Sequence, residues 1–431
     1  MPEPVLLMGL FLLLLFLDVP VAFAIGAPSA LVIILFRPDV PLAVVNARLL
    51  QGTDSFPLLA VPFFLLAGDL MSTGGITRRL VNLAMALVGH ITGGMSHVVV
   101  VTNMVMAGMS GSALADTVAT GSVLIPSMKQ VGYPARYSAA IVAAAGTIGP
   151  IIPPSVPFVI LGLVANISVA RLFLGGALPG TIMGLALIAT GYALARRRGY
   201  RREAGMSLWQ FLRVAWEALP ALGMPLIVFG GILGAVFTPT EASAVAAVYA
   251  LLVGLFIYRE LHLRALPAIF LQAVRVTASI TFIIATASLF SWLLTIYQVG
   301  PQLTQAIARL STDPLVFLLV VNVFFLIVGC FMETLSALVL FVPVLMPTVR
   351  ALHVDPVHFG VMVTLNLMIG LLTPPFGMSM FVTSRLAGVS LAEFVQEALP
   401  FIATLIVVLL LITLVPSIVL WIPNAFMGVP R

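Results

Sequence analysis

Small polar side chains gather in one short stretch of an otherwise apolar chain. The stretch Gly108-Met109-Ser110-Gly111-Ser112-Ala113-Leu114-Ala115-Asp116-Thr117 offers hydroxyl, carboxylate and backbone carbonyl oxygens close together. Glycines let the backbone approach a bound ion closely. Oxygen ligands of low total charge suit a hard cation such as Na⁺. We therefore predict a cation site to which the following residues contribute: Ser110, Gly111, Ser112, Asp116 and Thr117.

A proline-rich stretch supplies further oxygens. The residues Gly149-Pro150-Ile151-Ile152-Pro153-Pro154-Ser155 lie inside an apolar segment, where prolines prevent a continuous helix. The carbonyl groups that this break frees must find partners inside the protein or in a wet cavity. We predict that Gly149, Pro150, Ile152 and Ser155 complete the first cation site. Close helix packing by small residues is the alternative explanation.

A second, less polar set of residues lies in the other half of the chain. We predict a second ion site there, formed by Glu333, Thr334, Thr373 and Gly377. An intramembrane carboxylate is costly, so Glu333 either has a function or reaches an aqueous face. Arg385 is a candidate for attracting a carboxylate substrate, although such an arginine also marks the cytoplasmic end of a helix. The predicted substrate contacts are Ser110, Ser155, Thr373 and Arg385.

The elements that hold these residues must be membrane helices. Of the 431 residues, 61% are hydrophobic and only 8% are charged, against about 25% charged in a soluble domain. This composition excludes a soluble enzyme, a disordered chain and a nucleic-acid binder. The long unbroken apolar runs favour helices over a β-barrel. The first thirty residues lack a basic region and a cleavage site, so we expect a retained membrane helix there.

Two pairs of short apolar arms interrupt the series of full-length spans. Arms of about a dozen residues reach roughly 18 Å, too short for a core of about 30 Å. We therefore predict re-entrant hairpins over residues 95–129 and 313–350, and broken helices over 137–165 and 357–383. The other predicted segments are spans at 5–17, 21–36, 56–71, 172–195, 218–237, 242–258, 280–299 and 401–421, amphipathic pieces at 80–88 and 301–310, and a polar connection at 37–54.

The two halves of the chain repeat each other at an offset of 221 residues. From Gly108 to Pro154 this offset gives 11 identities in 47 positions, and they include the glycines and prolines of the breaks. We divide the chain into a first repeat (1–195), a basic linker (196–213) and a second repeat (214–431). The positive-inside rule places the linker in the cytoplasm. Its basic residues are Arg196, Arg197, Arg198, Arg201, Arg202 and Arg213.

The parity of the crossings makes the second repeat inverted relative to the first. Each repeat would hold five spans and one hairpin, an all-α polytopic arrangement typical of secondary transporters.

No phosphate-binding loop of an ATPase and no metal-ligand spacing of histidines is present, and we place His353 and His358 in a loop. We expect no enzyme; an intramembrane protease is the best catalytic alternative, and a channel or structural subunit is another. We interpret Asn103, Asn322 and Asn366 as links between helices.

These motifs resemble the large membrane subunit (DctM-like) of TRAP transporters, the tripartite ATP-independent periplasmic transporters. The resemblance rests on the glycine- and serine-rich tip, on Gly149–Ser155 and on Gly370-Leu371-Leu372-Thr373-Pro374-Pro375-Phe376-Gly377, and it extends from Val5 to Trp421. It implies an elevator-type fold and import of an organic acid, such as a C4-dicarboxylate or sialic acid, across the bacterial inner membrane. It further implies Na⁺ coupling, with about two ions.

The resemblance also implies partner proteins. These are a small membrane subunit, which we expect as a separate chain, and a periplasmic binding protein that delivers the substrate. We expect the binding protein to dock on the outer face at Arg37–Asp54, Val236–Glu241, Gly300–Asp313 and Arg350–His358. No nucleic acid is expected, and the lipid bilayer surrounds the chain. The alternative is a stand-alone dicarboxylate or citrate carrier that needs no binding protein.

Overall fold

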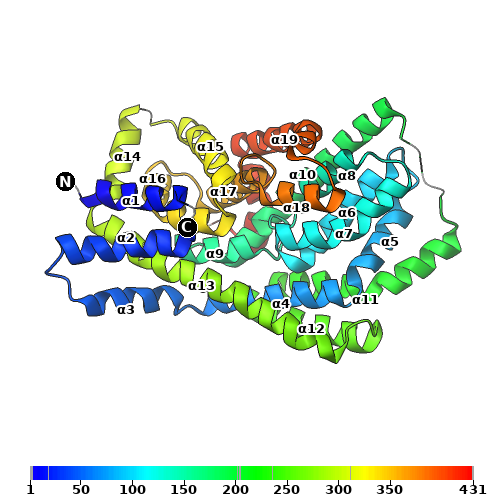
Figure 1. Cartoon of the computed structure of the whole chain (residues 1–431), viewed down its shortest axis with the longest axis horizontal. Coiled ribbons are helices and arrows are strands. Elements are labelled where there is room, and N and C mark those ends of the chain that lie inside the picture. The colour runs from blue at the N-terminus through cyan, green and yellow to red at the C-terminus, as the bar shows by residue number, and fades with distance from the viewer. Residues whose placement is uncertain are drawn as a thin grey trace.

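The computed structural model describes residues 3–17, 19–200, 202, 205–234, 236–310 and 312–429. Arg201 of the predicted linker lies outside these ranges. Within them all regular elements are helical (Figure 1). Eight of the described helices are long and apolar enough to cross a membrane. The fold is therefore the all-α polytopic fold that the composition predicts.

The first repeat contains ten α-helices and one short 3₁₀ turn, and glycines or prolines lie at most of its breaks. They are α1 (Glu3–Phe16), α2 (Val21–Phe36), α3 (Leu42–Thr53), η1 (Phe56–Leu59), α4 (Ala60–Thr73), α5 (Ile76–Val88), α6 (Gly94–Ser110), α7 (Ala113–Gln130), α8 (Ala135–Gly146), α9 (Val156–Ala165) and α10 (Val169–Arg198).

The second repeat begins inside the predicted linker 196–213, because α10 extends to Arg198 and α11 already starts at Leu208. It contains α11 (Leu208–Leu233), α12 (Pro239–Leu252), η2 (Val253–Ile257), η3 (Leu263–Ala265), α13 (Leu266–Ile296), α14 (Val299–Leu310), α15 (Pro314–Phe331), α16 (Thr334–Ala351), α17 (Pro356–Gly370), α18 (Met378–Ala387), α19 (Leu391–Leu414) and α20 (Ser417–Met427).

The helices pair between the repeats as the sequence offset predicts. Helices α7 and α16 each have 18 residues and begin 221 positions apart. The hairpins are α6–α7 and α15–α16, and the broken helices are α8–α9 and α17–α18. The α2–α3 turn and α14 lie at one end of the long axis, whereas α5 and the α10–α11 connection lie at the other (Figure 1). The two repeats thus have opposite orientations.

Four predicted elements need correction. The connection over 37–54 is not only a loop, because its apolar residues form α3, which packs on α13. The hairpin arms have 17 to 18 residues rather than a dozen, since the helices continue to the tips. Helix α13 starts at Leu266, well before the predicted 280. The last predicted span is two helices, α19 and α20, separated at Val415–Pro416.

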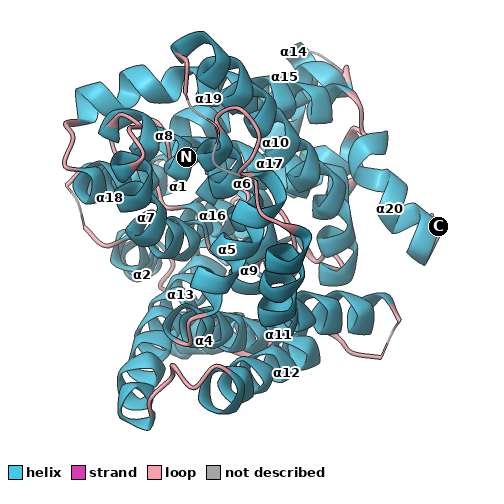
Figure 2. Cartoon of the chain, turned by 90° about the vertical axis from the view of Figure 1, so that its right-hand side faces the viewer, coloured by secondary structure: helices cyan, strands magenta, loops and turns pink. Residues whose placement is uncertain are grey.

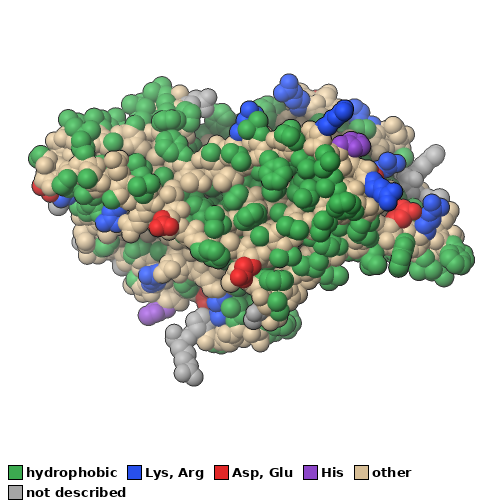
Figure 3. Space-filling model, turned by 90° about the horizontal axis from the view of Figure 1, so that it is seen from below, with side chains coloured by type: hydrophobic (Ala, Val, Ile, Leu, Met, Phe, Trp, Pro, Cys, Tyr) green, Lys and Arg blue, Asp and Glu red, His purple; other side chains and the backbone are tan. Residues whose placement is uncertain are grey.

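The helices form two layers when viewed along the long axis. Helices α4, α11, α12 and α13 lie together in the lower part of Figure 2, and the hairpins and broken helices lie above them. The amphipathic helices α5 and α14 connect α4 and α13 to the hairpins, as the short amphipathic segments predict. On the face in Figure 3, hydrophobic side chains cover the middle, and most Lys and Arg side chains lie toward the right-hand end.

Candidate ion and substrate sites

The tip of the first hairpin lies directly against the first helix break. Between α6 and α7, Gly111 has a positive φ of 61°, which glycine adopts without steric cost. A Cβ atom at Gly111 would lie only 2.6 Å from the carbonyl oxygen of Pro154. The backbone N–H of Val156 donates to the carbonyl oxygen of Gly111 at 3.4 Å. A glycine is therefore required where the tip meets the break.

Ser155 organises the break between α8 and α9. Its hydroxyl donates to the carbonyl oxygen of Pro150 at 2.5 Å and accepts from the backbone N–H of Phe158 at 3.2 Å, which caps α9. Capping satisfies a backbone donor that the break leaves unpaired. Because both bonds use the Ser155 hydroxyl, the structure gives this side chain a structural role in the predicted site.

Asp116 and Thr117 provide two buried oxygens without partners. The Ser110 hydroxyl donates to Asp116 Oδ1 at 2.5 Å, but Asp116 Oδ2 and Thr117 Oγ1 have no hydrogen-bond partner. Both residues are completely buried. A Cβ atom at Gly149 would clash with Asp116 Oδ2, and one at Gly146 would clash with Thr117 Oγ1. The unpaired oxygens therefore point at the break, where buried polar atoms ordinarily have partners.

Ser112, Pro150 and Ile152 lie at the edges of this cluster. Ser112 Oγ accepts from the backbone N–H of Ala115 at 3.4 Å and caps α7. Ser112 and Pro150 line a cavity beside the tip. Ile152 packs against Gly180 of α10, where a Cβ atom would meet the Ile152 side chain. The structure brings most of the predicted first set together around the junction of tip and break.

The second hairpin meets the second break in the same way. The backbone N–H of Phe376 donates to the carbonyl oxygen of Cys330 at 3.1 Å. Glu333 caps α16, where its Oε2 accepts from the backbone N–H of Ser336 at 3.1 Å and from the Ser336 hydroxyl at 3.2 Å. Thr373 Oγ1 donates to the carbonyl oxygen of Gly370 at 3.0 Å. Glu333 and Thr373 thus have partners within this junction, whereas the buried hydroxyl of Ser379, two residues after Gly377, has none.

Gly377 and Thr334 complete the second predicted set. The Gly377 N–H donates to the carbonyl oxygen of Thr373 at 3.1 Å. Thr334 begins α16 beside Glu333 and is buried. Thr373 Oγ1 also lies 3.1 Å from the Cys330 sulfur. Glu333 and Thr334 face the same cavity as Ser112, whereas Thr373 and Gly377 do not line it.

A cavity of about 170 Å³ separates the two hairpin tips. Ser112 borders it from one tip, and Glu333 and Thr334 from the other. Leu65 of α4 and Val276 and Ile280 of α13 form its opposite wall. No sequence signal marks these three apolar residues, because their type does not distinguish them from other membrane positions. The cavity combines apolar walls with a few polar groups, as small-molecule sites commonly do.

The predicted substrate residues do not line this cavity. Ser110 and Ser155 are buried in the first junction, and Thr373 lies within the second. Arg385 is exposed in the last turn of α18. Among the described residues, no group of three or more His, Cys, Asp and Glu side chains is arranged to hold a metal ion. A hard cation would need hydroxyl and carbonyl ligands.

The asparagines link helices, which confirms their predicted role. Asn366 Nδ2 donates to the carbonyl oxygen of Asn322 at 2.8 Å and to its Oδ1 at 2.9 Å, which joins α17 to α15. Asn103 Nδ2 donates to Thr120 Oγ1 at 3.3 Å, between α6 and α7.

The loop prediction was wrong for His358, which is buried in the first turn of α17 and contacts the carbonyl oxygen of Ile412 at 2.9 Å.

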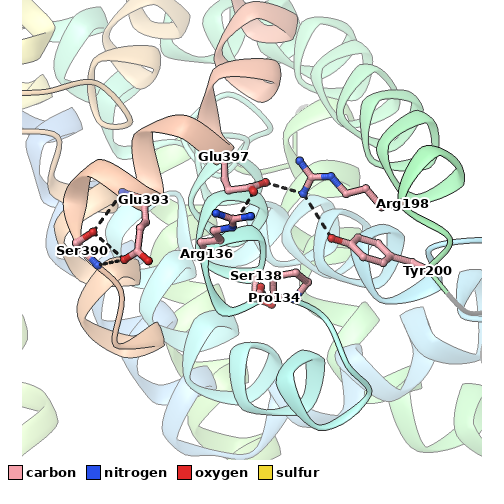
Figure 4. A network of polar contacts seen from close by, with 8 residues as sticks. All are labelled: Pro134, Arg136, Ser138, Arg198, Tyr200, Ser390, Glu393 and Glu397. Carbon is pink, nitrogen blue, oxygen red and sulfur yellow. Dashed lines mark hydrogen bonds and ion pairs between the residues drawn. The ribbon is translucent and has the colours of Figure 1, made fainter.

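Sequence reasoning missed one buried carboxylate, Glu397 of α19. It forms ion pairs with Arg136 of α8 at 3.0 Å and with Arg198 of α10 at 2.7 Å (Figure 4). Arg198 Nη1 also donates to the hydroxyl of Tyr200 at 3.4 Å. The network joins both repeats near the start of the basic linker. Only the contrast between Glu397 and its apolar neighbours could have indicated it.

Two inverted repeats, with hairpin tips against helix breaks around a central cavity, are an arrangement typical of membrane transporters. A family model described as "Tripartite ATP-independent periplasmic transporter, DctM component" matches residues 8–418. This chain belongs to that family, the large permease subunit of TRAP transporters.

Relatives with known names cover nearly the whole chain. The isethionate TRAP transporter permease protein DctMQ of Oleidesulfovibrio alaskensis is 43% identical over 97% of this chain, which spans 66% of that protein's length. The sialic acid TRAP transporter large permease protein SiaM of Vibrio cholerae is 40% identical, with 96% of this chain and 97% of that protein covered. The C4-dicarboxylate TRAP transporter large permease protein DctM of Pseudomonas aeruginosa is 40% identical, with 93% and 94% covered.

A solved structure shares the fold. The crystal structure of the Alcanivorax borkumensis YdaH transporter, described as having an unusual topology, superposes with a TM-score of 0.66 and 14% identity. The alignment covers 96% of this chain and 98% of that chain. At this identity the likeness concerns the fold alone.

Proposed function

We propose that this chain couples an inward Na⁺ gradient to the import of an organic acid. The observation that carries the proposal is the pair of unpaired buried oxygens, Asp116 Oδ2 and Thr117 Oγ1, at the first junction. A buried carboxylate without a partner is costly, and a bound cation would offset that cost. The residues present fit Na⁺, which prefers hydroxyl, carbonyl and single carboxylate oxygens.

The coupling follows from the position of the site. Ser112 and Pro150 belong to the first junction and also border the cavity between the tips. Na⁺ bound at this junction would hold the tip and the break in the geometry that shapes the cavity. By the resemblance to its family, about two ions bind, and the second would lie near Glu333, Thr334, Thr373 and Gly377. Binding energy shared between ion and substrate is what couples their transport.

The substrate class is a carboxylate or a related organic anion. Relatives are named for isethionate, sialic acid and C4-dicarboxylates, and another, YiaN of Escherichia coli, for 2,3-diketo-L-gulonate. These four anions are the natural panel of test substrates. The cavity between the tips is the proposed binding place, with the Ser112 hydroxyl as a polar contact.

The proposed partners are a small membrane subunit and a periplasmic binding protein. We place the chain in the bacterial inner membrane, with its basic linker in the cytoplasm. The outer face then carries the α2–α3 turn, where Arg37 and Asp39 form an ion pair of 2.8 Å. The hydrogen bond from Arg37 lowers the pKa of the Asp39 carboxyl, so both side chains of this pair are charged at neutral pH. Helix α3 adds a rigid element to the proposed docking face.

Reconstitution tests the proposal. The chain and its small subunit are placed in liposomes with an inward Na⁺ gradient, and uptake of the four labelled anions is measured with and without the binding protein. We expect uptake of at least one anion, dependent on Na⁺ and on the binding protein. Equal uptake when K⁺ replaces Na⁺ would contradict the coupling. Full uptake of free substrate without the binding protein would instead favour the stand-alone carrier.

Orientation is tested separately by cysteine labelling. Cys330 is the only cysteine, so Cys330→Ser gives a background without thiols. Single cysteines replace Lys129, at the end of α7, or Arg350, in the last turn of α16. An impermeant maleimide on intact spheroplasts should label position 350 and spare position 129. The reverse pattern would overturn the proposed orientation.

A further inference from the structure

Helix α13 carries a polar stripe that the proposed site does not use. Gln272, Arg275 and Ser279 are all exposed, and their spacing of three and four residues places them on one face of the helix. Arg275 lies about 13 Å along α13 from its first residue, at ~1.5 Å per residue. Within the described part of the chain, its guanidinium has no hydrogen bond or ion pair. A charged side chain on a membrane helix is costly against lipid, so it snorkels to the interface or meets water, an anion or a partner charge.

The stripe lies beside the central cavity. Val276 and Ile280 line the cavity, and Gln272 lies one turn below Val276 toward the start of α13. On α7, Leu114 lines the cavity. Val118, which is 46% exposed, and Ser122, which is also exposed, follow Leu114 at four-residue spacing. Exposed side chains thus continue from the cavity along both helices.

Both helices lead to the same end of the molecule. From the cavity, α7 runs toward Lys129, and α13 runs back toward Arg264, which precedes its first turn. Figure 2 is viewed from the end that carries the α10–α11 connection, and it shows α7 and α18 above α13. Arg385 of α18 is exposed. Basic residues therefore border both sides of the path.

We propose that these exposed faces form a water-filled vestibule between the cavity and the basic end, and that Arg275 binds carboxylate anions within it. The planar guanidinium can hold a carboxylate with two parallel hydrogen bonds. The vestibule rests on the exposure of these two helix faces, and its positive charge rests on Arg275 and on the basic residues at its end. That the passing anion is the transported acid rests on the proposed function.

The test measures the charge that Arg275 places in the vestibule. A single cysteine, Ser279→Cys, is introduced in the Cys330→Ser chain, which is coexpressed with its small subunit. Inside-out vesicles are reacted with an anionic and a cationic methanethiosulfonate reagent of similar size, and the ratio of the two labelling rates is determined. Thr281→Cys is the control position, because Thr281 faces the separate apolar cavity of about 680 Å³ between α3, α4 and α13.

We expect Ser279→Cys to react with both reagents and to favour the anionic one. A unit charge one helical turn away in a water-like medium changes the rate ratio roughly five- to tenfold between Arg275 and Arg275→Gln. Arg275→Lys should retain the preference, and high salt should reduce it. Thr281→Cys should show no effect of Arg275.

Two outcomes would overturn the inference. If Ser279→Cys does not react, lipid or the small subunit covers the stripe, and no vestibule is present. If it reacts but the ratio is the same with Arg275→Gln, Arg275 does not act on anions there. Neither outcome depends on Na⁺ or on the identity of the substrate, so failure of the proposed function would leave this test intact.

Discussion

The two junctions between hairpin tip and helix break share a backbone but differ in side chains. In the first junction the backbone N–H of Val156 donates to the carbonyl oxygen of Gly111, and in the second the N–H of Phe376 donates to that of Cys330. The Pro-Pro bond of each break is cis. At three equivalent positions the chemistry is opposite, with polar residues in the first junction and apolar ones in the second. The pairs are Ser110 and Phe331, Asp116 and Ala337, and Ser155 and Phe376.

The second junction has aromatic packing where the first has hydroxyl groups. The rings of Phe331 and Phe376 lie 6.2 Å apart, where the first junction has two serine hydroxyls. Its single carboxylate, Glu333, occupies the position of Ser112 and caps a helix instead of pointing at the break. The comparison teaches that the repeat supplies the close approach of tip and break, and we expect a few side chains to decide whether a junction binds an ion tightly.

Neutralising Asp116 should have the largest effect. Asp116→Asn keeps the size of the side chain but removes the charge beside the break. Loss of a charged ligand should lower Na⁺-driven uptake at limiting Na⁺ roughly 10- to 100-fold. Uptake is measured over a range of Na⁺ concentrations. The matched control is Asp69→Asn, which neutralises another carboxylate within a membrane helix, α4. Equal losses in both variants would show a general effect of charge.

Alanine at the two equivalent glycines should separate ion binding from folding. At Gly370 a Cβ atom would lie 2.6 Å from Gly329 Cα, and backbone on both sides cannot move aside. Gly370→Ala should therefore destabilise the protein by about 1–3 kcal/mol. At Gly149 the Cβ meets the Asp116 carboxylate, which can rotate away. Gly149→Ala should fold but bind Na⁺ weakly.

Thermal unfolding in detergent and Na⁺ titration of uptake measure both properties for each variant. If Gly149→Ala loses as much stability as Gly370→Ala and keeps its Na⁺ dependence, the first junction is packed like the second. That result would remove the difference between them.

Removing the Ser112 hydroxyl should have a moderate effect. Ser112→Ala loses the cap of α7, which costs about 1 kcal/mol, and loses one oxygen near the junction. The protein should stay monodisperse in size-exclusion chromatography but need several times more Na⁺ for half-maximal uptake, roughly what a loss of about 1 kcal/mol implies. Ser122→Ala, at an exposed serine of the same helix, should behave as wild type. An unchanged Na⁺ dependence would remove Ser112 from the ion site.

The aromatic pair of the second junction should have the smallest effect. Phe376→Leu removes a ring pair worth about 0.5–1.5 kcal/mol. Stability should fall by that amount, measured by thermal unfolding in detergent, while the Na⁺ concentration for half-maximal uptake stays the same. A large shift in Na⁺ dependence would mean that the second junction contributes to ion affinity more than its packing indicates.

Sequence patterns predicted the fold well because glycine, proline and hydrophobic length act locally. The breaks at Gly149–Ser155 and Gly370–Gly377 and the hairpins follow from backbone chemistry that one chain segment determines. The length of the hairpin arms was underestimated, since small polar residues near the tips, such as Ser110, remain helical when protein surrounds them. The apolar residues of α3 were overlooked inside a connection that looked polar.

The candidate site was predictable where residues are chemically unusual for a membrane. Asp116 is such a residue, and the structure places it as expected against the break. The cavity wall formed by Leu65, Val276 and Ile280 was not predictable, because only the tertiary arrangement selects them. Arg275 is also chemically unusual for a membrane helix, but the role of its side chain depends on which face of α13 it occupies.

Equilibrium Na⁺ binding tests the central claim most directly. The purified chain is heated in Na⁺ or K⁺, and the shift of its unfolding temperature is measured for wild type, Asp116→Asn and Phe376→Leu. Because a ligand that binds only the folded state stabilises it, we predict stabilisation by Na⁺ and not by K⁺ in wild type and in Phe376→Leu, and a marked reduction of it in Asp116→Asn. Full Na⁺ stabilisation of Asp116→Asn would contradict the assignment of the first junction as the ion site.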